Sequence, residues 1–141
     1  MNITERRLLM LVLDNDRCPS EEWLGGIRDK PTRARIERQI DKLSRDLGVQ
    51  RGLQGIAELK IDFIDFGPGY RVYYGFLDQK TVVVLIGGGD KSSQTRDIAD
   101  ARQLWANFVK GGASERALRV WKEEQEAGEE GKEEADEAEK F

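Results

Sequence analysis

Hydrophobic positions recur with a period of two in several parts of the chain, which predicts β-strands there. Residues 57–63 and 70–77 alternate between two faces, and residues 6–13 predict a first strand. The run 81–86 is apolar at nearly every position, which is typical of a strand buried on both faces. The tight connection at residues 77–80 predicts a hairpin. Because the strands of this central region follow one another without a helical pattern between them, we expect an antiparallel sheet.

Apolar residues three and four positions apart predict helices in other parts of the chain. The clearest helix begins at Pro31 and ends before Gly48, with an apolar stripe of Ile36, Ile40, Leu43 and Leu47. Residues 21–27 predict a short helix before it. Residues 98–108 predict a final helix of the domain, and residues 113–127 predict a further helix with few large apolar side chains. Together with the strands, these helices predict an α+β fold.

The length and the charge distribution indicate one domain followed by a tail. The chain has 141 residues, enough for a single domain with a core. Residues 1–112 contain 18 Lys or Arg against 16 Asp or Glu, whereas residues 113–141 contain 5 against 11. We therefore expect a mildly basic domain over residues 1–112 and an acidic tail over residues 113–141 that is partly helical to disordered.

The residue types that are missing exclude several kinds of site. The chain has no histidine, which is the commonest general base and metal ligand. Cys18 is the single cysteine, so it predicts a packed thiol and neither a disulfide nor a cysteine zinc site within the chain. The run from Gly87 to Ser92 lacks the glycine spacing of a phosphate-binding loop. We expect no metal and no small-molecule cofactor.

The apolar run at residues 8–13 is too short for a signal peptide, because Asp14 follows it directly. No run of the sequence reaches the length that a membrane span requires. These observations predict a cytoplasmic protein without a membrane partner.

One face of the helix that begins at Pro31 carries four basic side chains: Arg35, Arg38, Lys42 and Arg45. Asp41 is spaced to pair with two of these arginines. The glycine-containing segment 49–55 predicts a loop that exposes Arg51. Charges in such an arrangement often form a solvated surface, and the alternative is a surface that binds RNA or the ribosome.

Several motifs in a fixed order resemble the RelE/ParE superfamily of type II toxin–antitoxin toxins, in its HigB-like or addiction-module killer branch. The similarity covers residues 20 to 108. The motifs are Trp23-Leu24, Arg33-Ala34-Arg35-Ile36-Glu37-Arg38-Gln39-Ile40, Glu58-Leu59-Lys60-Ile61-Asp62, Gly67-Pro68-Gly69-Tyr70-Arg71-Val72-Tyr73-Tyr74 and Gly88-Gly89-Asp90-Lys91-Ser92-Ser93-Gln94, followed by Asp97-Ile98. Each motif is weak by itself, and their order makes the resemblance specific.

This resemblance implies a RelE-like fold, in which a helical hairpin and a C-terminal helix pack on a twisted antiparallel β-sheet. It also implies a toxin that cuts mRNA on the ribosome as a metal-independent endoribonuclease, and a cognate antitoxin that neutralises it. The alternatives are a ParE-like inhibitor of DNA gyrase without chemistry of its own, and an inactive relative that binds its antitoxin for regulation. The tail could be solvated, could lie across the basic face of its own chain, or could form a helix where an antitoxin docks.

The resemblance implies catalytic roles for Arg71, Lys91 and Lys60, and the alternation of residues 70–77 places Tyr73 on the same face as Arg71. Cations held on a rigid strand can stabilise the charge that develops on a phosphate during RNA cleavage. The alternative for Arg71 is an ion pair with Glu58 or Asp62 on the neighbouring strand. The chain departs from the RelE pattern at Glu58 and Asp97, where RelE members carry lysine and tyrosine.

Overall fold

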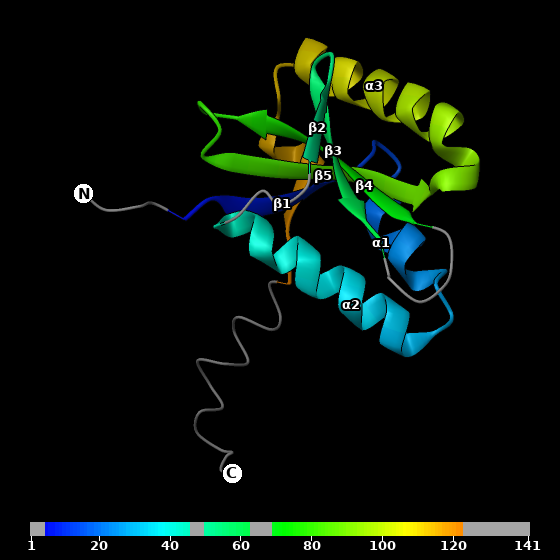
Figure 1. Ribbon diagram of the computed structural model, residues 1–141. Helices are drawn as coiled ribbons and strands as arrows, with labels where there is room; N and C mark the ends of the chain where they lie inside the picture. The colour runs from blue at the N-terminus through cyan, green and yellow to red at the C-terminus, as the bar shows by residue number, and fades with distance from the viewer. Residues whose placement is uncertain (1–4, 46–49, 63–68, 123–141) are drawn as a thin grey trace.

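Six strands form one sheet in the computed structural model, which describes residues 5–45, 50–62 and 69–122 (Figure 1). In these ranges the strands are β1 (Arg7–Leu11), β2 (Gln50–Leu53), β3 (Ile56–Ile61), β4 (Tyr70–Leu77), β5 (Val82–Asp90) and β6 (Leu118–Val120). Their order across the sheet is β2-β3-β4-β5-β1-β6. Three α-helices accompany them, so the α+β class is confirmed.

The sheet is mixed, and the prediction of an antiparallel sheet is wrong at one pair. Strands β1 and β5 run parallel, with Leu9 opposite Val84, while the other four pairs are antiparallel. The chain leaves β1, passes through two helices and three strands, and returns beside β1 in the same direction. Periodicity reports which face a side chain occupies but not which strand lies next to it, so this pairing could not be read from the pattern.

The helices lie on both faces of the sheet. Helices α1 (Pro19–Gly25) and α2 (Lys30–Asp41) cover one face, and α3 (Gln94–Lys110) covers the other (Figure 1). The Asp29 carboxylate caps α2 by accepting from the backbone N–H of Thr32 at 3.1 Å. A 3₁₀ turn, η1 (Lys42–Ser44), continues α2. None of the helices within the described ranges has both the length and the apolar character to cross a bilayer.

Two segments differ from the sequence prediction because short strands replace the expected loop and helix. Residues 50–53 form β2, which pairs with β3 through a turn at Gln54 and Gly55, where Gly55 has φ 93°. The glycine read as part of a loop therefore closes a tight hairpin. The segment predicted as a helix from residue 113 contains instead the 3₁₀ turn η3 (Glu115–Ala117) and the edge strand β6, and its residues 123–127 lie outside the described residues.

Gly87, Gly88 and Gly89, which follow the apolar run 81–86, belong to β5. A β-bulge between Tyr73 and Tyr74 aligns Tyr73 with Gly87 and Tyr74 with Leu85, which leaves Ile86 as the extra residue. As a result Gly87 and Gly89 share the face of α3. Of the predicted turn Gly67-Pro68-Gly69, the first two residues lie outside the described residues, as do Leu47 and Gly48 at the expected end of α2.

Each face of the sheet has its own hydrophobic cluster. The cluster under α1 and α2 includes Ile36, Ile40 and Leu43 of the predicted stripe, which are almost completely buried. The cluster under α3 includes Trp105 and Phe108, as the pattern predicts. Cys18 is a buried free thiol in the first cluster. The predicted core residues are therefore confirmed on both faces.

Candidate functional site

The candidate site lies on the α3 face of the sheet, where three strands align polar residues. Arg71 of β4 lies between Lys60 of β3 and Gly89 of β5 in the strand register. In the next row Tyr73 lies between Glu58 and Gly87. Residues paired in register point to the same face, so Lys60, Arg71, Glu58 and Tyr73 form one polar group on a sheet.

Arg71 is buried and held by two carboxylates. Its side chain is 6% exposed, with Nη1 3.5 Å from Asp62 Oδ1 and Nε 3.9 Å from Glu58 Oε2. Its Nη1 also donates to the backbone carbonyl of Tyr70 at 3.2 Å. The predicted alternative, pairing with Glu58 or Asp62, is thus what the structure shows, and both acids take part. These contacts fix the guanidinium in place and reduce its exposure to a large ligand.

Glu58 connects three elements at the centre of this group. It is 2% exposed, so this polar position of β3 is buried under α3. Its Oε1 accepts from Arg51 Nε at 3.1 Å, and its Oε2 accepts from Gln94 Nε2 at 2.8 Å. A buried carboxylate needs such partners because burial removes its hydration. Glu58 therefore ties β2 and the first residue of α3 to the strand beside Arg71.

The N-terminal turn of α3 adds a further carboxylate beside Glu58 and Asp62. Asp97 packs directly over Gly89, and a Cβ atom at Gly89 would overlap its carboxylate. Ser93 Oγ donates a hydrogen bond to Asp97 Oδ2. Neither Ser93 nor Gln94 was predicted as a site residue. The contacts of these two residues depend on where α3 lies over the sheet, and the hydrophobic pattern of the sequence does not predict that position.

Two exposed lysines flank the buried arginine. Lys60 is 47% exposed, and its Nζ lies 3.7 Å from Asp62 Oδ2. Lys91 is exposed in the 3₁₀ turn η2 (Lys91–Ser93), and its backbone N–H donates to the carbonyl of Gly69 at 3.1 Å. With adjacent strands about 4.8 Å apart, the Cα atoms of Lys60 and Gly89 are about 10 Å apart. The structure therefore brings the backbones of Lys60, Arg71 and Lys91 to one end of the α3 face.

Tyr73 does not match its predicted role as an accessible catalytic residue. It is 1% exposed and belongs to the hydrophobic cluster under α3. Burial raises the pKa of its phenol, and the negative charges of Glu58 and Asp97 raise it further. The phenol therefore stays protonated at neutral pH and is shielded from a base that would stack on it. A cavity of about 170 Å³ lies beside it, lined also by Asp97 and Asp100.

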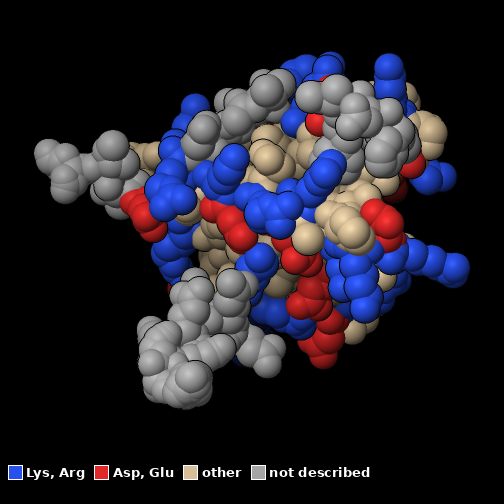
Figure 2. All heavy atoms as spheres, turned by 60° about the horizontal axis from the view of Figure 1, so that its bottom comes forward, with Lys and Arg blue, Asp and Glu red and all other residues tan. Residues whose placement is uncertain are grey.

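The remaining predicted residues divide between two surfaces. Arg51 lies on the α3 side, where its exposed guanidinium pairs with Glu58. Four exposed basic residues lie along α2 and the 3₁₀ turn that continues it, on the opposite side of the sheet. They are here called the α2 basic face: Arg35, Arg38, Lys42 and Arg45. Figure 2, in which the α2 side comes forward, shows many Lys and Arg side chains interspersed with Asp and Glu.

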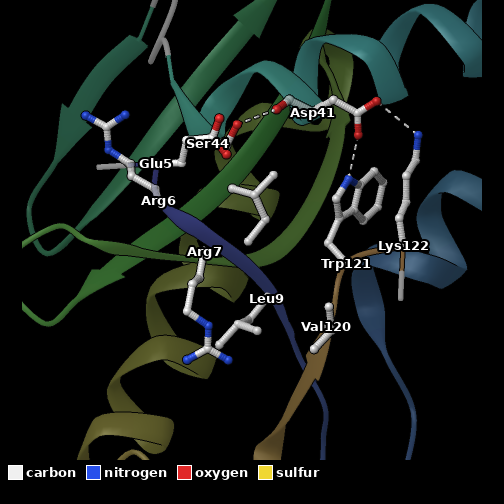
Figure 3. A pocket seen from close by; sticks show the side chains of 10 residues that line it. Glu5, Arg6, Arg7, Leu9, Asp41, Ser44, Val120, Trp121 and Lys122 are labelled. Carbon is white, nitrogen blue, oxygen red and sulfur yellow. Dashed lines mark hydrogen bonds and ion pairs between the residues drawn. The ribbon is translucent and has the colours of Figure 1, made fainter. Parts of the chain in front are cut away.

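Asp41 next to this face has different partners from those predicted. Its Oδ1 accepts from Trp121 Nε1 at 2.8 Å, and its Oδ2 lies 3.1 Å from Lys122 Nζ (Figure 3). The predicted pairing with Arg38 or Arg45 is wrong, because the end of β6 reaches Asp41 from a distant part of the sequence. A cavity of about 650 Å³ adjoins this contact and is lined by Arg6 and Arg7 among others.

One relative was found in comparisons with known proteins. The chain is 38% identical over 87 residues to an uncharacterized protein of Haemophilus influenzae, and the alignment covers 60% of this chain and 83% of the relative. No family model matches the chain. No solved structure matches it.

Proposed function

The chain belongs to the same family as this uncharacterized Haemophilus influenzae protein, and we propose that it is the toxin of a type II toxin–antitoxin pair. The toxin has a RelE-like fold and inhibits translation by cutting mRNA on the ribosome. Its partners are mRNA, the ribosome and a cognate antitoxin. The motif order from Trp23 to Gln94, similar to that of HigB-like toxins, supports this proposal.

The observation that carries the proposal is the row formed by Lys60, Arg71 and the β5 end that leads to Lys91. Attack of a ribose 2′-hydroxyl on the adjacent phosphate puts extra negative charge on the phosphoryl oxygens. Fixed cations stabilise that charge without reorganising during the reaction. Arg71 provides a fixed guanidinium on a central strand, with its charge offset by Glu58 and Asp62, and the two exposed lysines provide the uncovered positive charge that contacts the backbone of the RNA.

The site contains few groups suited to proton transfer at neutral pH. The chain has no histidine, and the phenol of Tyr73 is buried with a raised pKa. Such a site gains most of its rate from holding the reactive geometry. This agrees with an enzyme that acts on mRNA already positioned in the ribosome, because the ribosome then supplies the alignment that the protein lacks.

The test is cleavage of a defined mRNA in a purified translation system, mapped by primer extension with and without ribosomes. We expect cleavage in the presence of ribosomes, and a loss of at least about 100-fold in the Arg71→Lys variant, because lysine cannot reproduce the fixed fork of the guanidinium. Arg17→Lys is the matched control, since Arg17 forms an exposed ion pair with Glu22 at 2.6 Å outside the site. Circular dichroism and thermal unfolding verify that both variants fold.

A second candidate function is a non-catalytic relative that binds its antitoxin for regulation. The burial of Arg71 between Glu58 and Asp62 favours it, because the same contacts that fix the guanidinium also neutralise it. Induced expression separates the candidates. Rapid loss of protein synthesis supports the endoribonuclease, and harmless expression with retained antitoxin binding supports the regulatory relative. DNA damage signalling without loss of translation supports the gyrase inhibitor.

A further inference from the structure

The described part of the chain ends at a fixed point beside α2. Trp121 is 7% exposed, and its indole N–H donates to Asp41 near the end of the helix. Lys122 pairs with the other oxygen of the same carboxylate at 3.1 Å, and Figure 3 shows both side chains directed toward Asp41. The described chain therefore ends, at Lys122, next to the last turn of α2, on the side of the sheet away from α3.

Because Trp121 and Lys122 occupy Asp41, that carboxylate does not form the predicted ion pairs with the α2 basic face. Lys42 and Arg38 are exposed there. Arg45 forms a long ion pair with Glu5, in which Arg45 Nη1 lies 3.9 Å from Glu5 Oε2, and both side chains are more than 60% exposed. Exposed pairs of this kind neutralise little charge. The α2 basic face is therefore a cationic surface near Lys122, after which the acidic segment 123–141, here called the tail, begins.

The segment that follows has the opposite charge. Residues 123–141 contain ten Asp or Glu against two Lys, a net charge of −8. Residues 1–122 contain 21 Lys or Arg against 17 Asp or Glu, a net charge of +4. The two parts of the chain attract each other, and the attraction is strongest where cations lie within a Debye length of about 10 Å of the tail at 0.1 M salt.

The tail is also long enough to reach the whole face. Helix α2 has 12 residues and is about 18 Å long at 1.5 Å per residue. Nineteen residues can extend about 60 Å. A segment tethered next to its binding surface has an effective concentration in the millimolar range, so weak individual contacts suffice for substantial occupancy.

We propose that residues 123–141 bind the α2 basic face of the same chain as an intramolecular polyanion. Carboxylates of the tail pair with Arg38, Lys42 and Arg45, whose charges Asp41 leaves uncompensated. The bound tail covers the surface that a phosphate backbone would otherwise contact. This last consequence rests on the proposed function in RNA cleavage, whereas the binding of the tail does not.

The test of tail binding is zero-length crosslinking of the full chain with a carbodiimide, which joins a lysine amine to a carboxylate in direct contact. We expect intramolecular crosslinks between Lys42 and glutamates of residues 123–141, identified by mass spectrometry of the monomer. Lys110 at the end of α3 is the matched control, since it is exposed on the opposite side of the sheet. We expect Lys42 crosslinks to exceed Lys110 crosslinks by at least about fivefold at low salt and to fall several-fold at 1 M salt, where the Debye length is about 3 Å.

Three results would overturn the proposal: equal crosslinking of Lys42 and Lys110, an absence of crosslinks at Lys42, or crosslinks confined to covalent dimers, which would place the tail on a second copy. The Lys42→Arg variant verifies the assignment because it retains the charge and removes the reactive amine. A full-length variant with Glu129→Gln, Glu130→Gln, Glu133→Gln and Glu134→Gln retains the length of the tail and reduces its charge. We expect this variant to lose most of the Lys42 crosslinks.

The consequence for RNA has a separate readout. The same four-glutamine variant should bind a fluorescent single-stranded RNA about tenfold more tightly than the parent at 0.1 M salt. The gain should disappear when Arg38→Gln and Lys42→Gln are added. If the Lys42 crosslinks form as expected but RNA affinity does not change, the tail binds the α2 basic face and that face is not an RNA surface. The two proposals can therefore fail independently.

Discussion

The two faces of the sheet are packed by different kinds of side chain. Under α1 and α2, aliphatic and aromatic residues fill the interface, with Ile36 and Leu85 completely buried. Under α3, a comparable apolar cluster around Trp105 covers part of the face, and the end near the start of the helix is occupied by the buried charges of Glu58 and Arg71. One face is thus apolar in its interior, and the other changes along its length from apolar to ionic.

This difference indicates where the fold tolerates a cost in stability. An apolar interface requires matching volumes, which many residue combinations satisfy. A buried ion pair loses hydration and contributes little net stability, so replacing it by apolar residues is often neutral or stabilising. The burial of Glu58 and Arg71 is therefore better explained by a functional role of their charges than by packing alone. Because both residues lie on the α3 face, we place that function on this face and not on the α2 side.

The largest effect is expected on the apolar face. Replacing Ile36, which is 0% exposed under α2, by alanine removes buried methylene groups and leaves a cavity. The Ile36→Ala variant should lose about 2–5 kcal/mol in the free energy of unfolding, measured in urea. Ile36→Val, which removes one methylene group, is the control and should lose about 1 kcal/mol. Equal losses in the two variants would show that the site collapses around the deletion and that packing there is loose.

The second effect concerns the ionic end of the α3 face. Glu58→Leu removes one of the two carboxylates that contact the buried Arg71 and leaves its charge only partly compensated. The free energy of unfolding should fall by about 3 kcal/mol, and Asp62 remains as the carboxylate partner of Arg71 in the described contacts. The double variant Glu58→Leu with Arg71→Met should recover most of this loss, and under the proposed function it should no longer cleave mRNA. Urea unfolding of the two single variants and the double variant completes the cycle. If the losses of the single variants simply add, the two residues do not interact and the ionic interpretation is wrong.

The third effect compares Tyr73 and Tyr74, neighbours on β4 that face opposite sides of the sheet. Burial raises the pKa of Tyr74 to about 12, and burial together with Glu58 and Asp97 raises that of Tyr73. Above pH 10 the unfolded chain therefore releases phenolic protons before the folded chain, and stability that is complete below pH 10 is lost as pH rises. For Tyr74 the loss at pH 11 is about 1 kcal/mol. Urea unfolding at pH 8 and pH 11 should show this fall in the parent and a smaller fall in Tyr74→Phe.

For the fold, the hydrophobic pattern predicted the elements with large buried faces. The stripe of Ile36, Ile40 and Leu43 reflects burial, which periodicity reports directly. The alternation of β4 predicted the strand, although residues on both of its faces are buried. Two short strands were missed, because β2 has four residues and β6 has three. Such strands depend on a neighbouring strand that offers hydrogen bonds, and their own sequences contain too few positions to show a period.

For the site, the resemblance implied roles for Arg71, Lys60 and Lys91, and the strand register brings their backbones to one end of the α3 face. The sequence did not predict the burial of Glu58 or the packing of Asp97 over Gly89. Both depend on where α3 begins above the sheet and on the bulge beside Tyr73, which sets the face of each glycine in β5. These are properties of the packed structure, so residue spacing does not predict them.

The smallest effect on stability is expected at Lys60, the exposed member of the ionic group. Its pair with Asp62 is 3.7 Å long with both side chains about half exposed, so Lys60→Gln should change the free energy of unfolding by less than about 0.5 kcal/mol. If Lys60 contacts the phosphate backbone, ribosome-dependent mRNA cleavage should nevertheless fall about tenfold. Lys80→Gln is the control, because Lys80 is exposed in the turn between β4 and β5, outside the site. Full cleavage by a folded Lys60→Gln protein would restrict the ionic group to a role in structure, and the difference between the two faces would then concern folding alone.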